Sequence, residues 1–293
     1  MPKPRRPAPT SGVAPTSGVA PASGTVLVGG GGPQGGPPVA PPARARPAAA
    51  PPGDRRWPPL RPVRPSGWWC DAALAACVVA LTVALARGAL LEFDVGVRDW
   101  VLAHRHPAPW WSARVLNFLG QGGLVLVPVC VGLAGWLARR TRSARPLLPV
   151  VGAFLLGYAT VGPLKLLLDR GYPRNTELAH PERLFSDPVG GLAYPSGHAV
   201  NAVLWYAVAM LLVAGLRRAY ARPPLSAATR RTIRVLPPVV VSCTTVYLAF
   251  HWVTDAVAGV LLGLLLARLW ARVDWDALPL PARLGDWRRP AGL

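Results

Sequence analysis

Two ionisable residues stand four positions apart inside one of the most apolar regions of this chain. They are His251 and Asp255, in the stretch YLAFHWVTD at residues 247–255. This i, i+4 spacing puts both side chains on one side of a helix that begins near His251. The aspartate can then accept a proton from one imidazole nitrogen and leave the other nitrogen free as nucleophile or base. The alternative is a simple helix cap, in which Thr254 or Asp255 satisfies the free amides of a helix start.

A second histidine, His198, belongs to the stretch YPSGHAVN, where a Pro-Ser-Gly turn opens a helix. Free amides at a helix N-terminus, together with the helix dipole, make a site for an anion. Ser196 can add its hydroxyl group to that site, next to Gly197. An ordinary turn with a helix cap is again the alternative.

Lys165 is the third candidate, because Lys3 is the only other lysine in a chain that otherwise uses arginine. A compact ammonium group suits a bound phosphate. The alternative is a lysine that extends from a membrane helix to the interface.

Six apolar runs must position these residues, and each has roughly the length needed to cross a hydrocarbon core about 30 Å thick. They cover about 70–90, 117–138, 147–168, 197–216, 235–250 and 254–271. The fold class is therefore predicted to be all-α: a polytopic membrane protein whose residues 67–272 form a six-helix transmembrane bundle. Only His251 to Thr254 separate the last two runs, so these four residues are predicted to form the turn at one membrane face. A single buried hairpin in a soluble protein is the alternative.

The two ends of the chain have a different composition. Residues 1–66 are rich in Pro, Ala, Gly and Arg and contain the repeat APTSGV, APTSGV, APASGT between Ala8 and Thr25. Such a segment is predicted to be disordered and is no signal peptide. Residues 273–293 are predicted to be a short C-terminal tail. The four cysteines have neither paired nor metal-ligand spacing, which favours neither a disulfide framework nor a zinc site.

The net charge of +19 and the 52% hydrophobic residues argue against a soluble domain. No basic recognition module is present, so nucleic acid is not an expected partner. The arginines gather in the tail and in the loops after the second and fourth runs. By the positive-inside rule these parts, and both termini, are predicted to be cytoplasmic in the cell membrane, next to anionic lipids of the inner leaflet. Lys165, His198, His251 and Asp255 then share the outer face.

Three stretches, KLLLDRGYP, YPSGH and TTVYLAFHWVTD, resemble in this order the signature motifs of the type 2 phosphatidic acid phosphatase superfamily. This family includes membrane lipid phosphatases and soluble vanadium haloperoxidases. The resemblance covers about residues 68–271. It implies that His251 attacks phosphorus with the help of Asp255, that His198 protonates the leaving oxygen, and that Lys165, Ser196 and Gly197 hold the phosphate. It also implies that hydrolysis needs no metal or other cofactor.

Two family arginines are missing from their expected positions, which here are Tyr172 in the first motif and Thr245 in the third. Removing one preorganised donor to a developing anion typically lowers the rate about 100- to 1000-fold. Arg170 and Arg174, which flank Tyr172, are the candidate replacements for phosphate binding, and Arg183 is a weaker one.

The sequence thus predicts an integral membrane phosphatase or phosphotransferase that acts on a phosphorylated lipid at the outer face. The main alternative, motivated by the missing arginines, is a catalytically weak or inactive member that binds a lipid headgroup or a partner protein. A transporter or channel with polar pore residues is a third and weaker alternative.

Overall fold

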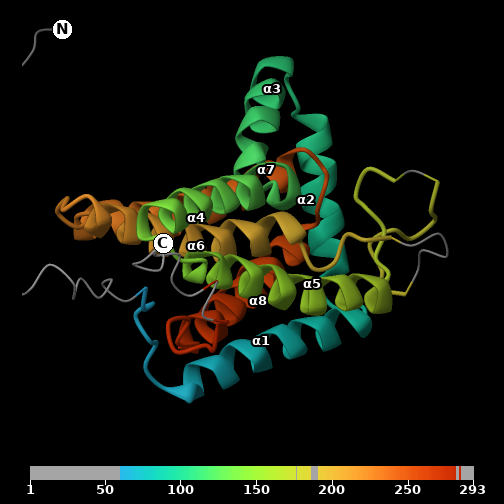
Figure 1. The fold of residues 1–293 in the computed structure, drawn as a ribbon. Helices are drawn as coiled ribbons and strands as arrows, with labels where there is room; N and C mark the ends of the chain where they lie inside the picture. The colour runs from blue at the N-terminus through green and yellow to red at the C-terminus, as the bar shows by residue number, and fades with distance from the viewer. Residues whose placement is uncertain (1–59, 176, 186–190, 282–283, 285–293) are drawn as a thin grey trace, which may run out of the picture. The chain divides into compact units, whose positions relative to one another are not determined.

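In the part of the chain that the structure describes, six long helices form the body and two shorter helices lie at one end of it (Figure 1). The structure is a computed structural model that describes residues 60–175, 177–185, 191–281 and 284, all within one compact unit. Residues 1–59 of the predicted disordered segment 1–66, with the repeat, lie outside the described residues, as does most of the predicted tail beyond residue 281. The long helices are α1 (Trp68–Ala86), α4 (Val127–Thr141), α5 (Leu148–Leu168), α6 (Gly197–Ala219), α7 (Ala227–Tyr247) and α8 (Val253–Arg272). The short ones are α2 (Leu91–Ala103) and α3 (Pro107–Leu116).

Five of the long helices are long and apolar enough to cross a membrane, namely α1, α5, α6, α8 and α4 taken together with the turn before it, as Gly122–Thr141. The sixth, α7, has 21 residues, but its first half carries Arg230, Arg231 and Arg234, and its second half holds the predicted apolar run. The protein is therefore an all-α, multi-pass membrane protein, as the apolar runs predict. The second run starts irregularly, because a 3-10 turn at Asn117–Gly120 and a π turn at Gly122–Leu126 precede α4.

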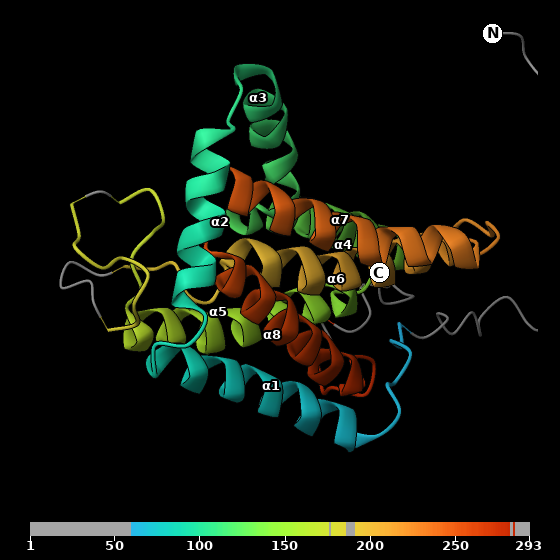
Figure 2. The same cartoon turned by 180° about the vertical axis from the view of Figure 1, so that it is seen from behind.

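Helix α6 occupies the centre of the bundle and packs against α4, α5, α7 and α8, while α1 covers the outer side of α8 (Figures 1 and 2). Its contact with α8 depends on two glycines spaced four residues apart, Gly259 and Gly263, which let two helix backbones approach closely. A Cβ atom added to Gly259 would lie 2.5 Å from the Ser196 carbonyl oxygen, and one added to Gly263 would lie 2.9 Å from Val203 Cβ. The small residues therefore set the distance between the starts of α6 and α8.

Replacing Gly259 with alanine is expected to lower the free energy of unfolding by about 1–3 kcal/mol, because the new methyl group overpacks the α6–α8 contact. Gly132→Ala in α4 is the matched control, since nothing lies within 4 Å of a Cβ atom at that position. Denaturation of the purified variants in detergent micelles measures both changes. An equal effect of the two substitutions would contradict the proposed close packing.

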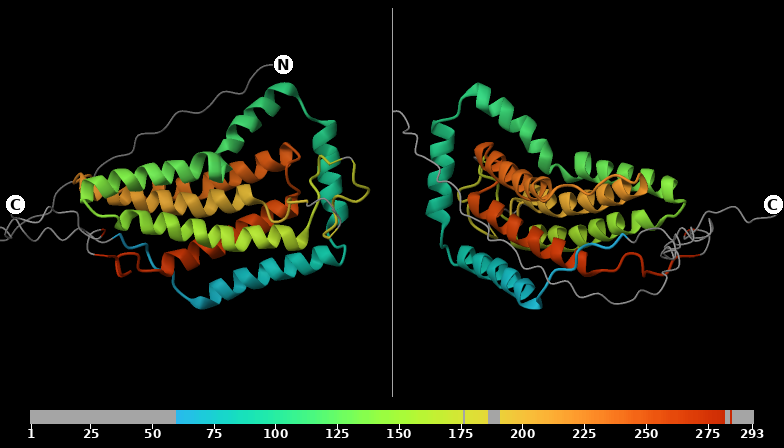
Figure 3. Two further views of the ribbon diagram at one scale, coloured as in Figure 1. Left: turned by 45° about the vertical axis from the view of Figure 1, so that its right-hand side comes forward. Right: turned by 90° about the vertical axis from the view of Figure 1, so that its left-hand side faces the viewer.

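The connection between α1 and α4 is the main feature that the apolar runs do not predict. It folds into α2 and α3, and α2 crosses the end of the bundle at a steep angle to the long helices (Figures 1 and 3). Large apolar side chains such as Phe93, Trp100 and Trp111 remain exposed on these two helices. The end that α2 crosses is called the motif end, because His198 and His251 lie there. The other end is called the basic end, because α4 and α6 finish there with Arg139, Arg140, Arg217 and Arg218.

A buried carboxylate ties two helices together at the basic end. Asp71, in the first turn of α1, forms ion pairs with Arg268 and Arg272 in the last turns of α8. The guanidinium carbon of Arg272 also lies 3.8 Å from the centroid of the Trp68 ring. Leu60, inside the range predicted as tail, is buried in the core of the bundle at this end, so the packed part of the chain begins before residue 66.

Candidate active site

The structure brings His198 and His251 together at the motif end. Their ring centroids lie 5.6 Å apart with an interplanar angle of 66°. His198 is the second residue of α6, and His251 lies in the turn between α7 and α8. The Nε2 atom of His198 is buried and has no hydrogen-bond partner within the described residues. Two imidazoles from distant parts of the chain thus face one shared site.

The position of His251 follows from the way in which α7 ends. Ala249 adopts a left-handed conformation with φ of 56°, while the amides of Ala249 and Phe250 donate to the carbonyls of Val246 and Thr245. This pattern of hydrogen bonds is a Schellman C-cap, in which a left-handed residue reverses the chain. The turn therefore occupies 248–252, slightly earlier than the predicted His251–Thr254, and α8 begins at Val253.

A backbone carbonyl fixes the tautomer of His251. Its Nδ1 atom lies 2.8 Å from the Ala193 oxygen, which can only accept a hydrogen bond, so Nδ1 carries the proton and the lone pair is on Nε2. The Asp255 Oδ2 atom is farther from Nδ1, at 3.6 Å. Burial lowers the pKa of His251 below its ordinary value, and the nearby Asp255 carboxylate opposes this shift. Near neutral pH the ring is therefore neutral with a free electron pair on Nε2.

Lys165 and the start of α6 lie beside the two histidines. The ammonium of Lys165 donates to the Leu192 carbonyl, and a Cβ atom on Gly197 would lie 3.6 Å from Lys165 Cε. Ser196 caps α6, because its Oγ accepts a hydrogen bond from the Ala199 amide at 3.4 Å. These three predicted phosphate-binding residues thus lie together at the N-terminus of a long helix, where amides and the dipole favour an anion.

The carboxylate of Asp255 is fully buried and already has two partners. Its Oδ2 accepts from the Trp252 amide at 2.9 Å, which is the helix cap given as the alternative role of Asp255, and its Oδ1 accepts from Arg170 Nη1 at 2.5 Å. The Asp255 backbone carbonyl accepts from the Ser196 amide at 3.0 Å. Asp255 therefore holds the start of α8 and also lies close to the Nδ1 side of His251.

The two arginines that were predicted to bind phosphate occupy different environments. Arg170 is fully buried, and its guanidinium donates to Asp94, Thr254, Asp255 and the Glu182 carbonyl. Arg174 is exposed, with its guanidinium carbon 5.5 Å from the centre of the Tyr172 ring and 4.8 Å from that of Phe250. The weaker candidate, Arg183, is exposed in the connection between α5 and α6.

Side chains of other types stand at the positions where the family motifs have arginine. The Tyr172 ring lies 6.2 Å from that of His251. Thr245 is fully buried, and its hydroxyl donates to the Val241 and Ser242 carbonyls of its own helix. The Thr245 hydroxyl therefore donates its proton within α7 and not to the site.

Two groups that contribute to this site could not be predicted from the sequence motifs. One is the Ala193 carbonyl, which no side-chain pattern can reveal. The other is Asp94 of α2, which is buried and lies outside all three motifs. It contacts Arg170 and Thr254. The only sequence signal is the i, i+4 pair of Asp94 and Arg98, which places two charges on one helix face.

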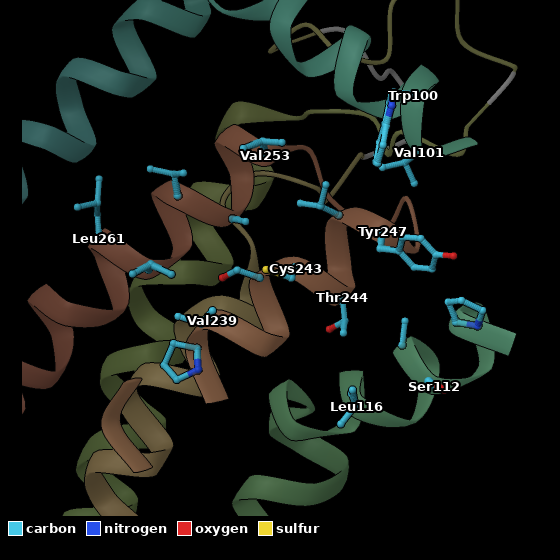
Figure 4. Close-up of a pocket in the computed structure, with 18 residues that line it drawn as sticks. Trp100, Val101, Ser112, Leu116, Val239, Cys243, Thr244, Tyr247, Val253 and Leu261 are labelled. Atoms are coloured by element: carbon cyan, nitrogen blue, oxygen red, sulfur yellow. The ribbon is translucent and has the colours of Figure 1, made fainter. Parts of the chain in front are cut away.

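An apolar groove lies directly behind the first turn of α8 (Figure 4). Its volume is about 890 Å³, and its walls come from α2, α3, α7 and α8. Val253 and Ala256, which flank Asp255, form part of one wall, and Thr244 lies in another. The other lining residues that Figure 4 labels are Trp100, Val101, Ser112, Leu116, Val239, Cys243, Tyr247 and Leu261.

The fold and site together define a class: a helical membrane protein with two facing histidines, a lysine and a helix N-terminus at one end of its bundle. Residues 146–279, which contain all three motifs, match the family model for the PAP2 superfamily. This part of the chain is therefore similar to the PAP2 superfamily. In the described residues no three His, Cys, Asp or Glu side chains gather so that they could hold a metal ion.

A solved structure has a similar fold. It is that of a transmembrane PAP2-type phosphatidylglycerolphosphate phosphatase from Bacillus subtilis, with a TM-score of 0.55 and 24% sequence identity. The match covers 69% of this chain and 94% of that one. No curated protein sequence is similar enough to count as a relative.

Proposed function

We propose that the protein is a membrane phosphatase that removes the phosphate group of a phosphorylated lipid through a phosphohistidine on His251. The observation that carries this proposal is the histidine pair, in which Ala193 holds the Nδ1 proton of His251 and leaves Nε2 free, while His198 stands 5.6 Å away. The PAP2 superfamily match over residues 146–279 supports the same chemistry.

The reaction has two steps in this proposal. His251 Nε2 bonds to phosphorus, the bond between phosphorus and the lipid oxygen breaks, and protonated His198 gives its proton to that oxygen. Water, or an alcohol in a phosphotransferase, then attacks the phosphohistidine while His198 takes up its proton, and His251 Nε2 is released. Lys165 and the amides at the start of α6 stabilise the negative oxygens in both steps.

The motif end is assigned to the outer side of the cell membrane in this proposal, with both termini in the cytoplasm. The arginines at the ends of α4 and α6 and at the start of α7 lie at the opposite end of the bundle. Short basic segments favour the cytoplasmic side and its anionic leaflet. The site then lies at the depth of the outer headgroups.

The groove of Figure 4 supports a lipid as substrate, because it places apolar walls next to the α8 turn that carries Asp255. A tail that lies between α7, α8 and the α2–α3 connection can remain in an apolar environment beside the turn that carries His251, because Tyr247 and Val253 on either side of that turn line the groove. Predominantly apolar walls are typical of sites that bind small molecules.

Phosphate release by the purified protein tests this proposal. The substrates are a long-tailed lipid phosphate in mixed micelles and a short-chain, water-soluble phosphate ester. We expect Val257→Trp, inside the groove, to raise KM for the lipid about tenfold and to change the soluble ester less than about twofold, because the indole fills the tail site. Leu264→Trp, two turns farther along α8 and outside the groove, is the control. Equal effects on both substrates would contradict a tail in the groove.

A protein that binds a phosphorylated headgroup without turnover is the second candidate function. Buried Thr245, whose hydroxyl is bonded to its own helix, favours it, because no arginine occupies that motif position. Tight binding of the lipid phosphate without phosphate release is the result that this alternative predicts.

A further inference from the structure

A chain of three buried charged groups extends from α2 to the turn that carries His251. Arg170 is completely buried and lies between Asp94 and Asp255, which are 1% and 0% exposed. Its Nη2 donates to Asp94 Oδ2 at 2.8 Å, and its Nη1 donates to Asp255 Oδ1 at 2.5 Å. Thr254 links the same groups, because its amide donates to Asp94 Oδ1 at 3.1 Å and its hydroxyl to Asp94 Oδ2.

This cluster has two carboxylates for one guanidinium, so its net charge is negative. If Arg170 faced Asp255 alone, the two charges would cancel next to His251. Asp94 instead shares the guanidinium, since each carboxylate receives a different Nη atom. The surplus negative charge remains in a buried region, where water screens it poorly.

Helix α2 makes a second contact with the same region, which holds Asp94 in place. The guanidinium of Arg98, one turn after Asp94, lies 5.5 Å from the centroid of the Trp252 ring, and that of Arg170 lies 5.4 Å from it. The Trp252 indole donates to the Gly171 carbonyl at 2.9 Å. Asp94 and Arg98 of α2 thus contact Thr254 and Trp252, which follow His251 directly in the chain.

We propose that Asp94 is a positioning residue whose charge, shared through Arg170, lets Asp255 stabilise the positive charge that develops on His251 when Nε2 bonds to phosphorus. This inference rests on the proposed phosphohistidine function. Asp94 itself touches neither His251 nor the phosphate; it acts through Arg170 and Thr254.

The other charged groups around His251 make this surplus important. Lys165 from α5 disfavours the positive form of the ring, and the rings of His198 from α6 and Tyr172 from the α5–α6 connection lie 5.6 Å and 6.2 Å from it. Asp255 from α8 favours the positive form, and Arg170 behind it weakens that effect. Asp94 reduces this effect of Arg170, because it shares the guanidinium with Asp255.

The substitution Asp94→Asn tests the inference, because it removes the charge and keeps the size. Loss of a negative charge disfavours the imidazolium, so the His251 pKa falls. We expect the acid limb of the kcat/KM profile to move about one unit to lower pH, with kcat reduced about tenfold and KM changed less than about twofold. Asp71→Asn is the matched control, since Asp71 is also a buried carboxylate held by arginines, but at the basic end. Its acid limb and kcat are expected to stay unchanged.

A measurement without turnover separates this inference from the proposed function. Diethyl pyrocarbonate modifies neutral imidazole, and mass spectrometry of the His251 peptide gives the pH midpoint of that reaction. A lower midpoint in Asp94→Asn, with no phosphate release by the unchanged protein, would support the charge coupling and reject the phosphatase. Activity in the unchanged protein, with neither midpoint nor acid limb shifted in the variant, would reject the role of Asp94 alone.

If Asp94→Asn does not fold, Asp94→Glu provides the test. It retains the charge, so its acid limb and its modification midpoint are expected to match those of the unchanged protein even if kcat falls through altered geometry. A shift of about one unit in Asp94→Glu would overturn the inference, because charge would then not be the determinant.

Discussion

Replacing His251 with alanine is expected to reduce phosphate release by about 10⁴-fold or more, because the bond to phosphorus then has no nucleophile. The loss should appear in kcat, since Lys165 and the start of α6 still bind the phosphate. Ala193, whose carbonyl accepts the Nδ1 proton, loses only one hydrogen bond in this variant. Assays of steady-state phosphate release with saturating lipid phosphate measure the effect.

His104→Ala is the control for this first prediction. His104 is also bonded through Nδ1 to a backbone carbonyl, that of Trp100 at 2.8 Å, but it is exposed at the end of α2. Its replacement is expected to leave kcat unchanged. Activity of His251→Ala within about tenfold of the unchanged protein would reject His251 as the nucleophile.

Replacing Arg170 with alanine is expected to lower the free energy of unfolding by about 3–5 kcal/mol, because two buried carboxylates lose the cation between them. Asp94 and Asp255 are then left close together without compensation. Denaturation in detergent micelles measures the loss. The same substitution also removes the hydrogen bond to the Glu182 carbonyl, which ties the α5–α6 connection to the site.

Arg174→Ala is the matched control for this second prediction. Arg174 is exposed and stacks on Tyr172 and Phe250, so its removal is expected to change the free energy of unfolding by less than about 1 kcal/mol. A raised KM in Arg174→Ala would support its predicted role in phosphate binding. If Arg170→Ala instead raised KM and left the free energy of unfolding unchanged, Arg170 would be a phosphate ligand. The cluster of Asp94, Arg170 and Asp255 would then not contribute to stability.

The helices of the bundle could be predicted from the sequence, because the length and apolar character of a segment decide whether it can cross a membrane. The runs at 147–168, 197–216 and 254–271 coincide closely with α5, α6 and α8. The connection that forms α2 and α3 could not be predicted in this way. Its residues mix charged and apolar side chains, and what holds α2 in place is the buried contact of Asp94 with Arg170, a residue 76 positions away.

The site shows the same division between local pattern and tertiary contact. His198, His251, Asp255 and Lys165 carry motifs that can be recognised along the chain, and the structure gathers them at one end of the bundle. The surroundings of Arg170 and Arg174 depend instead on how the α5–α6 connection folds. Their adjacent positions around Tyr172 make both look able to reach a phosphate, yet one is buried between two carboxylates and the other lies on exposed rings.

Trapping of the phosphoenzyme tests the central claim most directly. The purified protein is mixed briefly with a lipid phosphate carrying ³²P and then denatured in alkali, where phosphohistidine survives and phosphoserine does not. A phosphohistidine on His251 predicts an acid-labile, alkali-stable label on the peptide that contains this residue, and no label in His251→Ala. A label on any other residue, or phosphate release by the unchanged protein with no trapped label, would contradict it.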